Sequence, residues 1–229
     1  TLRDCHFYNL GSSGVNVQNG LHVLIDSCSF ASMGDGGIEL VGGDRKNLEP
    51  SGNRITNCDI HHFGEWSRCY CVGIRVNGVA IRVDHNSIHD APQEAMGYGG
   101  NDHLIEYNDF YNLCQDADDS GATHTGRDWT QRGTVLRYNH IHGVANRSSA
   151  EQEVGIMGIY LDDWTSGHVL YGNIFEDVAR AVMLGSGRDN TLKKNVFVNC
   201  AVGVSFDARG LGWAQYYFDG RCNTLFDLL

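Results

Sequence analysis

The sequence predicts an all-β fold, a parallel β-helix of about eight coils, and three observations lead to this prediction. First, a short pattern, apolar-x-x-(Asn or Cys)-x-(Phe or Ile), recurs eight times at intervals of 22 to 34 residues. Self-similarity at such a period is typical of solenoids. Second, further apolar runs alternate with other residues as one-sided strands do. Third, the apolar spacing of an amphipathic helix is missing from the sequence.

The repeated pattern predicts one column of side chains that runs through all the coils. Its central position is occupied in turn by Cys5, Cys28, Cys58, Asn86, Asn108, Asn139, Asn173 and Asn195. One repeat cannot bury its own apolar face, so the repeats must stack at the strand spacing of about 4.8 Å. We expect the asparagines to take left-handed backbone angles and to hydrogen-bond their counterparts in the next coil. The cysteines should fill the same column as buried thiols.

A second strand in each repeat is predicted from alternating apolar residues. The clearest of these runs are Gly37–Leu40, Gly73–Val76, Gly158–Leu161, Ala181–Leu184 and Gly203–Phe206. Glycine is abundant (29) and proline scarce (2), which indicates a chain that turns through glycine and asparagine bends. The leucine spacing and the helix of a leucine-rich repeat are missing, which argues against that competing solenoid.

Length and charge set limits on the function. The 229 residues are enough for one domain with a substantial core, and the net charge of -11 argues against nucleic acid as a partner. No run of 18 apolar residues is present, so we expect no membrane span. The sequence begins inside a repeat and ends after an apolar segment without polar caps. We therefore expect residues 1–229 to be a single β-helix domain of a longer chain, whose other domains cover its ends.

Eight cysteines are spread along the chain: Cys5, Cys28, Cys58, Cys69, Cys71, Cys114, Cys200 and Cys222. Three of them belong to the repeated column. The Cys69-x-Cys71 spacing differs from the two-residue spacing of most zinc knuckles. We expect structural thiols, with a disulfide at Cys69 or Cys71 as one alternative and a metal site as another.

The chemistry is expected in two oversized repeats between Asn108 and Asn173, because loops inserted into a constant frame are how a solenoid carries a site. Segments 116–129 and 158–164 hold the densest polar sequence in these repeats. Both occupy the same strand position of neighbouring coils. The sequence thus predicts that the two polar segments lie side by side on neighbouring coils.

Alignment of these two segments at Ala122 and Ile159 defines the expected register. In this register Asp119 and Asp162 lie on one outer surface, about one coil apart. The alternation along the strand points the side chain of His124 inward. Two carboxylates facing one groove are what glycosidic hydrolysis requires, one as proton donor and one to activate water or attack carbon. Crowding of carboxylates should raise the pKa of at least one of them.

Asp119 and Asp162 are therefore the candidate catalytic pair. The residues expected to bind or orient a substrate around them are Asp118, His124, Arg127, Asp128, Trp129, Tyr160, Asp163 and Arg188. Aromatic rings among them offer flat apolar faces on which sugars pack.

Plainer interpretations stand beside this one. Aspartate-rich loops are commonly solvated turns, and an inward His124 would be a hydrogen-bonded core residue. Tyr98 also has inward parity and is expected in the core. We assign no metal ligands or cofactor, with one alternative. A Ca²⁺ ion near Asp116, Asp118 and Asp119 would suit clustered oxygen ligands.

Several segments together resemble a known group of proteins. They are residues 98–106, 119–130, 158–163, 187–190 and 212–220. These segments are similar to the right-handed, pectate-lyase-like parallel β-helix proteins of bacterial polysaccharide degradation, and above all to family 141 of the glycoside hydrolases, with its α-L-fucosidase and xylanase activities. The resemblance implies a polysaccharide or oligosaccharide substrate and two catalytic aspartates, which by motif are Asp119 and Asp162. It also implies a secreted, periplasmic or cell-surface protein.

Two other functions stay open at this point. A polysaccharide lyase would need a base, together with a calcium ion or Arg and Lys side chains to neutralise a uronate carboxylate. The acidic cluster would repel uronate unless calcium bridged it. The third possibility is a carbohydrate-binding β-helix module without catalytic activity.

Overall fold

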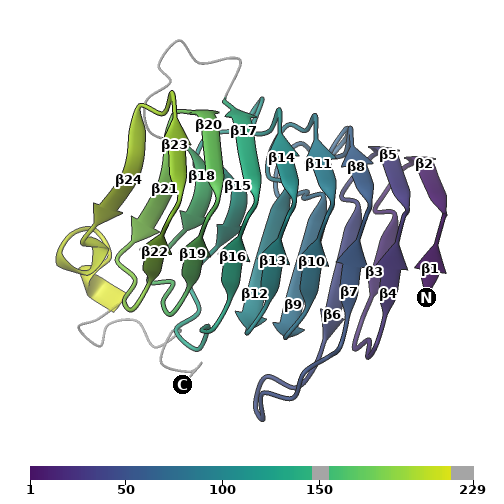
Figure 1. Ribbon diagram of the computed structural model, residues 1–229, viewed down its shortest axis with the longest axis horizontal. Helices are drawn as coiled ribbons and strands as arrows, with labels where there is room; N and C mark the ends of the chain where they lie inside the picture. Colours follow the sequence, from purple (N-terminus) through teal and green to yellow (C-terminus); the bar gives the residue numbers. More distant parts are fainter. Residues whose placement is uncertain (146–154, 218–229) are drawn as a thin grey trace.

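The protein is a stack of flattened coils whose first and last turns lie at opposite ends of the long axis (Figure 1). The computed structural model describes residues 1–145 and 155–217. Within these ranges 24 strands form three parallel sheets of eight strands each, and every coil gives one strand to each sheet. The predicted all-β parallel β-helix of eight coils is confirmed.

The first sheet contains the strands that begin the repeated pattern: β1 (Leu2–Arg3), β4 (Leu24–Asp26), β7 (Arg54–Thr56), β10 (Arg82–Asp84), β13 (Leu104–Glu106), β16 (Val135–Arg137), β19 (Val169–Tyr171) and β22 (Thr191–Lys193). The second contains the strands that end it: β2 (His6–Leu10), β5 (Ser29–Met33), β8 (Asp59–His61), β11 (Ser87–His89), β14 (Asp109–Tyr111), β17 (His140–Val144), β20 (Ile174–Val178) and β23 (Val196–Val198).

The third sheet contains the predicted second strand of each repeat: β3 (Val15–Val17), β6 (Ile38–Gly42), β9 (Ile74–Val79), β12 (Met96–Asn101), β15 (Ser120–Thr125), β18 (Ile156–Leu161), β21 (Arg180–Gly185) and β24 (Val202–Asp207). Two 3-10 helices follow, η1 (Arg209–Leu211) and η2 (Gln215–Tyr217). No helix in these described residues is long and apolar enough to cross a membrane.

The asparagine column forms a continuous hydrogen-bonded ladder between the first and second sheets. In a typical rung, the Nδ2 of Asn108 donates to Oδ1 of Asn139 and to the Val83 carbonyl, both at 3.0 Å. The expected left-handed angle falls elsewhere, on the residue before the ladder position, as at Tyr107 (φ 54°) and Tyr138 (φ 55°). The ladder asparagine satisfies backbone groups of the bend, while its neighbour takes the strained angle.

The inward side chains of all three sheets form one core along the axis. The aromatic and aliphatic positions of the repeated pattern are fully buried in the central coils, as Phe30 and Phe110 illustrate. Tyr98 lies in this core, as predicted. The column thiols of Cys28 and Cys58 are buried as well, and burial raises the pKa of Cys58 to about 12. Cys222 lies outside the described residues.

Candidate functional site

A polar pocket of about 350 Å³ lies beside the C-terminal part of the third sheet. It is lined by Asp119, Arg127, Tyr160, Asp162, Asp163, Asp207, Arg209 and Trp213. Asp119 directly precedes β15, and Asp162 directly follows β18 in the next coil. The structure therefore brings both candidate carboxylates to one pocket.

The register between the two coils differs by one residue from the expected one. Ile159 pairs with Thr123 rather than with Ala122, and His124 pairs with Tyr160. Thr123 is fully buried, so a threonine takes the inward position that the apolar pattern gave to its neighbour. The prediction of an inward His124 is consequently wrong, because the side chain lies on the outer face and reaches Asp162.

Local backbone features place Asp162 at the pocket. The chain turns sharply after β18, with left-handed angles at Asp163 (φ 20°) and Trp164 (φ 66°). The Thr165 hydroxyl fastens this turn by donating to the Asp162 carbonyl at 2.7 Å. On the preceding coil, a Cβ at Gly126 would stand 2.9 Å from the Cβ of Asp162. Glycine at that position leaves room for the carboxylate.

Arg209 forms the electrostatic centre of the pocket. Its side chain is only 9% exposed and carries ion pairs to Asp162, to Asp163 (Nη1 to Oδ1, 2.6 Å) and to Asp207 (Nε to Oδ2, 3.0 Å). Burial by itself would lower the pKa of the guanidinium, but these carboxylates and the Tyr160 hydroxyl raise it instead. Arg209 is thus a permanent cation that holds three aspartates from two regions of the chain.

Asp162 is held in its ionised form. Burial alone would raise the pKa of this carboxyl, but the hydrogen bond from His124 and the charge of Arg209 lower it well below the usual range. Crowding was expected to raise a pKa in this cluster. For Asp162 the opposite is found, because cationic groups take up both sides of the carboxylate.

His124 links Asp162 to a buried acid. Its Nδ1 lies 2.8 Å from Oε1 of Glu94, and its Nε2 lies 3.5 Å from Oδ2 of Asp162. The ring stacks on Tyr160, with centroids 4.7 Å apart and planes 11° from parallel. Burial lowers the pKa of the imidazole, but its two acidic partners outweigh that effect and raise the pKa to about 9. His124 is therefore a cation at neutral pH.

Tyr160 connects the two candidate carboxylates through its hydroxyl. The hydroxyl donates to Oδ1 of Asp119 at 3.0 Å and accepts from Nη2 of Arg209 at 3.3 Å. Burial and the charge of Asp162 raise the pKa of the phenol above its ordinary value, so it stays a neutral donor. A Cβ at Gly121 would stand 3.0 Å from the Cβ of Tyr160, so glycine allows this ring to approach β15.

A larger groove of about 1200 Å³ adjoins the pocket, and Asp207 lines both. Trp129 and Arg188, two of the predicted substrate-binding residues, lie along this groove. Trp129 and Trp164 pack edge to face, with ring centroids 6.2 Å apart. The pocket is lined mainly by charged side chains, and the groove is lined by aromatic as well as charged and polar ones.

Comparison with known proteins now defines the family. The family described as "Right handed beta helix region" matches residues 1–72 and 72–215. The chain belongs to the right-handed β-helix family. No curated protein matches its sequence significantly.

A solved structure with the name "Glycoside hydrolase" is similar to this right-handed β-helix, with a TM-score of 0.60 and 18% sequence identity. The similarity covers 86% of the present chain but 35% of the solved one, so the β-helix described here corresponds to about a third of that protein. At this identity the similarity concerns the fold.

The remaining predicted residues of this β-helix fall into two groups. Arg127 and Asp163 line the pocket and form an ion pair at 2.5 Å, as part of the same charge network. Asp128 instead pairs with Arg45 at 2.7 Å and lines neither depression, which indicates a role in holding the loop. Asp118 is exposed and also lines neither.

The aspartates of the calcium alternative are partly engaged with other side chains. Asp116 forms an ion pair with Arg68, and Asp119 accepts the hydrogen bond from Tyr160. Calcium binding here stays a prediction.

Sequence reasoning missed Arg209, Asp207 and Glu94. A signal for Asp207 was present, because Gly203-Val-Ser-Phe-Asp207 repeats the spacing of Gly158-Ile-Tyr-Leu-Asp162. Asp162 directly follows β18 and Asp207 is the last residue of β24, so both lie at the same end of the third sheet. Arg209 lies beyond the last strand, where no periodic pattern marks it.

Proposed function

We propose that this β-helix is a glycoside hydrolase domain that cleaves a polysaccharide or oligosaccharide, with Asp162 and Asp119 as its catalytic carboxylates. The observation that carries the proposal is the ionised Asp162, which lines the same pocket as Asp119, beside a groove that Trp129 and Trp164 line. Glycosidases use such a pair of acids on the two sides of the scissile bond. The family resemblance of the sequence motifs and the name of the similar structure support this choice.

The two carboxylates suit different roles. A carboxylate whose pKa is lowered is a weak base, because the efficiency of a base follows its pKa. Asp162 is therefore better suited to stabilise a positively charged oxocarbenium-like transition state, or to attack the anomeric carbon, than to remove a proton from water. Asp119 is the other candidate carboxyl of the pocket, and we assign it the delivery of a proton to the leaving oxygen.

The other groups prepare these two. His124 and Arg209 keep Asp162 anionic, and the Tyr160 hydroxyl orients Asp119. In the groove, Trp129 offers an aromatic face for a sugar ring and Arg188 a donor for its hydroxyls. The groove gives room for several sugar units, as an enzyme acting on a polymer needs.

A lyase is less well supported by this pocket. The two arginines that line it, Arg127 and Arg209, are already paired with aspartates. Neither is a free cation that could neutralise a uronate carboxylate. A carbohydrate-binding module without activity is the remaining alternative.

The test is an assay of the full chain against a panel of polysaccharides with product analysis. Fucosylated oligosaccharides and xylan come first because of the motif resemblance. We expect Asp162→Asn and Asp119→Asn each to lower kcat by about 10²- to 10⁴-fold. Asp177→Asn, an exposed aspartate on β20 of the second sheet, should keep full activity.

Three results would reject the proposal. Unsaturated, ultraviolet-absorbing products would identify a lyase, and loss of activity with a chelator would add calcium to its mechanism. Binding of oligosaccharide without turnover would identify a binding module. Full activity in both asparagine variants would place the chemistry elsewhere. Fractionation of cells that produce the protein tests the expected secreted, periplasmic or surface location.

A further inference from the structure

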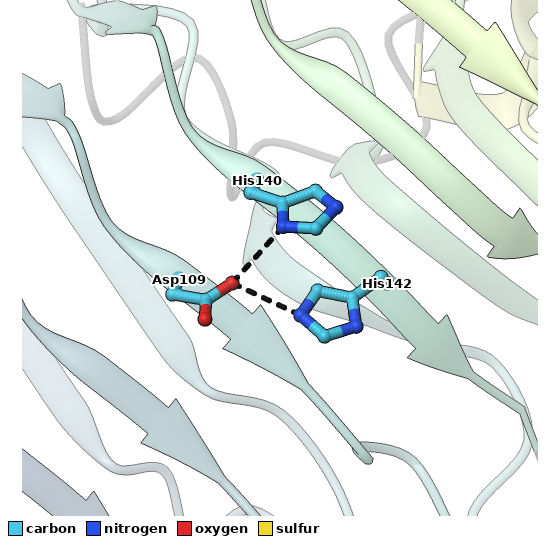
Figure 2. Close-up of side chains that lie close together, drawn as sticks. All are labelled: Asp109, His140 and His142. Atoms are coloured by element: carbon cyan, nitrogen blue, oxygen red, sulfur yellow. Dashed lines mark hydrogen bonds and ion pairs between the residues drawn. The ribbon is translucent and has the colours of Figure 1, made fainter.

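A second group of polar residues lies on the second sheet, away from the strands that build the pocket. Asp109 stands on β14, and His140 and His142 stand on β17 in the next coil (Figure 2). The two histidines are two positions apart on one strand, so both side chains point to the same face. All three residues are partly exposed on the outside of the coil.

The three side chains converge on one oxygen atom. Oδ1 of Asp109 lies 3.4 Å from Nδ1 of His140 and 3.0 Å from Nε2 of His142 (Figure 2). A metal ion with bonds of about 2.0–2.1 Å in tetrahedral directions separates its ligand atoms by about 3.3 Å. One ligand atom from each residue lies within 4.8 Å of the others, which makes the three residues a group that could hold one metal ion.

A carboxylate on the following coil approaches the opposite side of His140. Oε2 of Glu176, on β20, lies 3.4 Å from Nε2 of His140. A histidine that ligates metal through one nitrogen commonly donates its other N–H to a carboxylate, which fixes the ring and its tautomer. Here Glu176 contacts one nitrogen of His140 and Asp109 lies at the other, and the three residues come from three consecutive coils.

An open groove of about 410 Å³ borders the cluster, and Asp109 and His140 form part of its wall. Tyr107 and Tyr138 stack beside them, with ring centroids 5.1 Å apart. An ion at the three side chains would keep coordination positions open toward this groove. Three protein ligands and open positions are typical of sites that bind water or a further ligand.

We propose that Asp109, His140 and His142 form a binding site for a divalent transition metal ion of the Zn²⁺ type, with Glu176 positioning His140. Two imidazoles and one carboxylate suit such an ion, whereas Ca²⁺ and Mg²⁺ prefer six or more oxygen ligands. The bound ion joins neighbouring coils through β14 and β17. The site is independent of the proposed hydrolase function, because none of its residues lines the pocket or the aromatic groove.

An earlier pair of coils provides a matched comparison. Asp59, His61 and His89 occupy the same sheet with similar residue types, but the His61 Nε2 lies 3.9 Å from Oδ2 of Asp59 and the His89 Nε2 lies 3.1 Å from Oδ1. These two histidines approach different oxygens of Asp59, whereas His140 and His142 approach the same oxygen of Asp109. Within residues 1–145 and 155–217, the cluster at Asp109 is the one that brings three such ligand atoms within reach of a single ion.

The test is calorimetric titration of the chelator-treated full chain with Zn²⁺, together with thermal unfolding. We expect one saturable site per chain, and a rise in Tm of roughly 5–10 °C at a hundredfold excess over Kd. His142→Ala and His140→Ala should abolish both effects. Glu176→Gln should weaken binding by about 10- to 100-fold. His89→Ala should bind as the wild type does.

Co²⁺ supplies a second readout that does not depend on stability. Its visible absorption should appear with the wild type and His89→Ala and be missing with His142→Ala. Because the ligands are nitrogen and oxygen, the spectrum should lack thiolate charge-transfer bands. Equal binding by the wild type and His142→Ala, no saturable binding at all, or thiolate bands would each overturn the proposal. The last result would place the ion at cysteines such as Cys69 and Cys71.

Discussion

Arg209 forms an ion pair with Asp162 across the coil that lies between them. Asp162 follows β18, Arg209 follows β24, and β21 lies between these strands in the third sheet. A Cβ at Gly185, the last residue of β21, would stand 2.9 Å from Cζ of Arg209. The guanidinium therefore passes over a glycine to reach the carboxylate. The charge state of the pocket depends on a residue 47 positions away in the sequence.

Replacing the cation should change the acid side of the activity profile. In Arg209→Gln, Asp162 keeps the hydrogen bond from His124 but loses the charge of Arg209 that also lowers its pKa, so the pKa rises and the ionised form is lost at higher pH. We expect the acidic limb of the kcat/KM profile to move to higher pH and the free energy of unfolding to fall by about 3–5 kcal/mol. Arg3→Gln removes an exposed ion pair between Arg3 on the first coil and Asp26 on the second, and should change neither the acidic limb nor the free energy of unfolding. An unchanged acidic limb in Arg209→Gln would show that Asp162 is not the titrating group.

The glycine that Arg209 crosses can be tested separately. Gly185→Ala places a methyl group against Arg209 and 3.0 Å from the Asp163 amide nitrogen, so the guanidinium must shift. We expect the same change of pH profile as in Arg209→Gln, with a loss of about 1–3 kcal/mol in stability. Gly203→Ala is the control, because the nearest atoms to its Cβ would lie at 3.6 Å, an ordinary contact. Equal pH profiles and equal stabilities of the two alanine variants would contradict the passage of Arg209 over Gly185.

The coil frame could be predicted because its pattern is carried by buried residues that repeat. Every coil needs an apolar residue before the ladder position and an aromatic or isoleucine after it, so the periodicity is visible in sequence. The register error at Ala122 has a clear cause, since Thr123 is buried although its hydroxyl makes it look like a surface residue. Arg209 could not be predicted, because its position follows from the path of one turn and from the glycine beneath it.

His124, which pairs with Glu94 and Asp162, should make the stability of the protein depend on pH. The folded-state pKa of His124 is about 9, above its ordinary 6.5. The stabilisation that the protonated ring gives to the folded state is therefore complete below pH 6.5 and is lost as the pH rises to about 9. The free energy of unfolding should fall by on the order of 3 kcal/mol across this range. Urea unfolding from pH 6 to 10 should show this decline in the wild type but not in His124→Gln. An exposed histidine variant, His6→Gln, should retain the decline, and a decline that persists in His124→Gln would point to another group.

The asparagine ladder should be a principal source of stability. Asn108→Ala leaves the backbone N–H of Asn86 and the Val83 carbonyl without their buried partner. It also removes the side-chain donor to Oδ1 of Asn139, which keeps the backbone N–H of residue 108. Each unsatisfied buried group costs about 1–3 kcal/mol, so we expect a loss of about 3 kcal/mol or more in chemical unfolding. Asn16→Ala removes an exposed amide on β3 and should change stability by less than about 0.5 kcal/mol. Similar losses in both variants would mean that the ladder contributes no more than a surface contact.

The charge state of Asp162 also bears on the stereochemistry of the proposed reaction. An inverting enzyme needs a base that takes a proton from water, and a carboxylate held ionised by His124 and Arg209 is poorly suited to that task. A retaining enzyme needs an anion that faces the anomeric carbon and forms a glycosyl intermediate, which an ionised carboxylate at neutral pH can do. We therefore expect the first product to keep the anomeric configuration of the substrate, as followed by proton NMR before mutarotation. Added azide should restore turnover to Asp162→Ala by taking the place of the missing nucleophile. An inverted first product would instead assign Asp162 to the activation of water, despite the cations that lower its pKa.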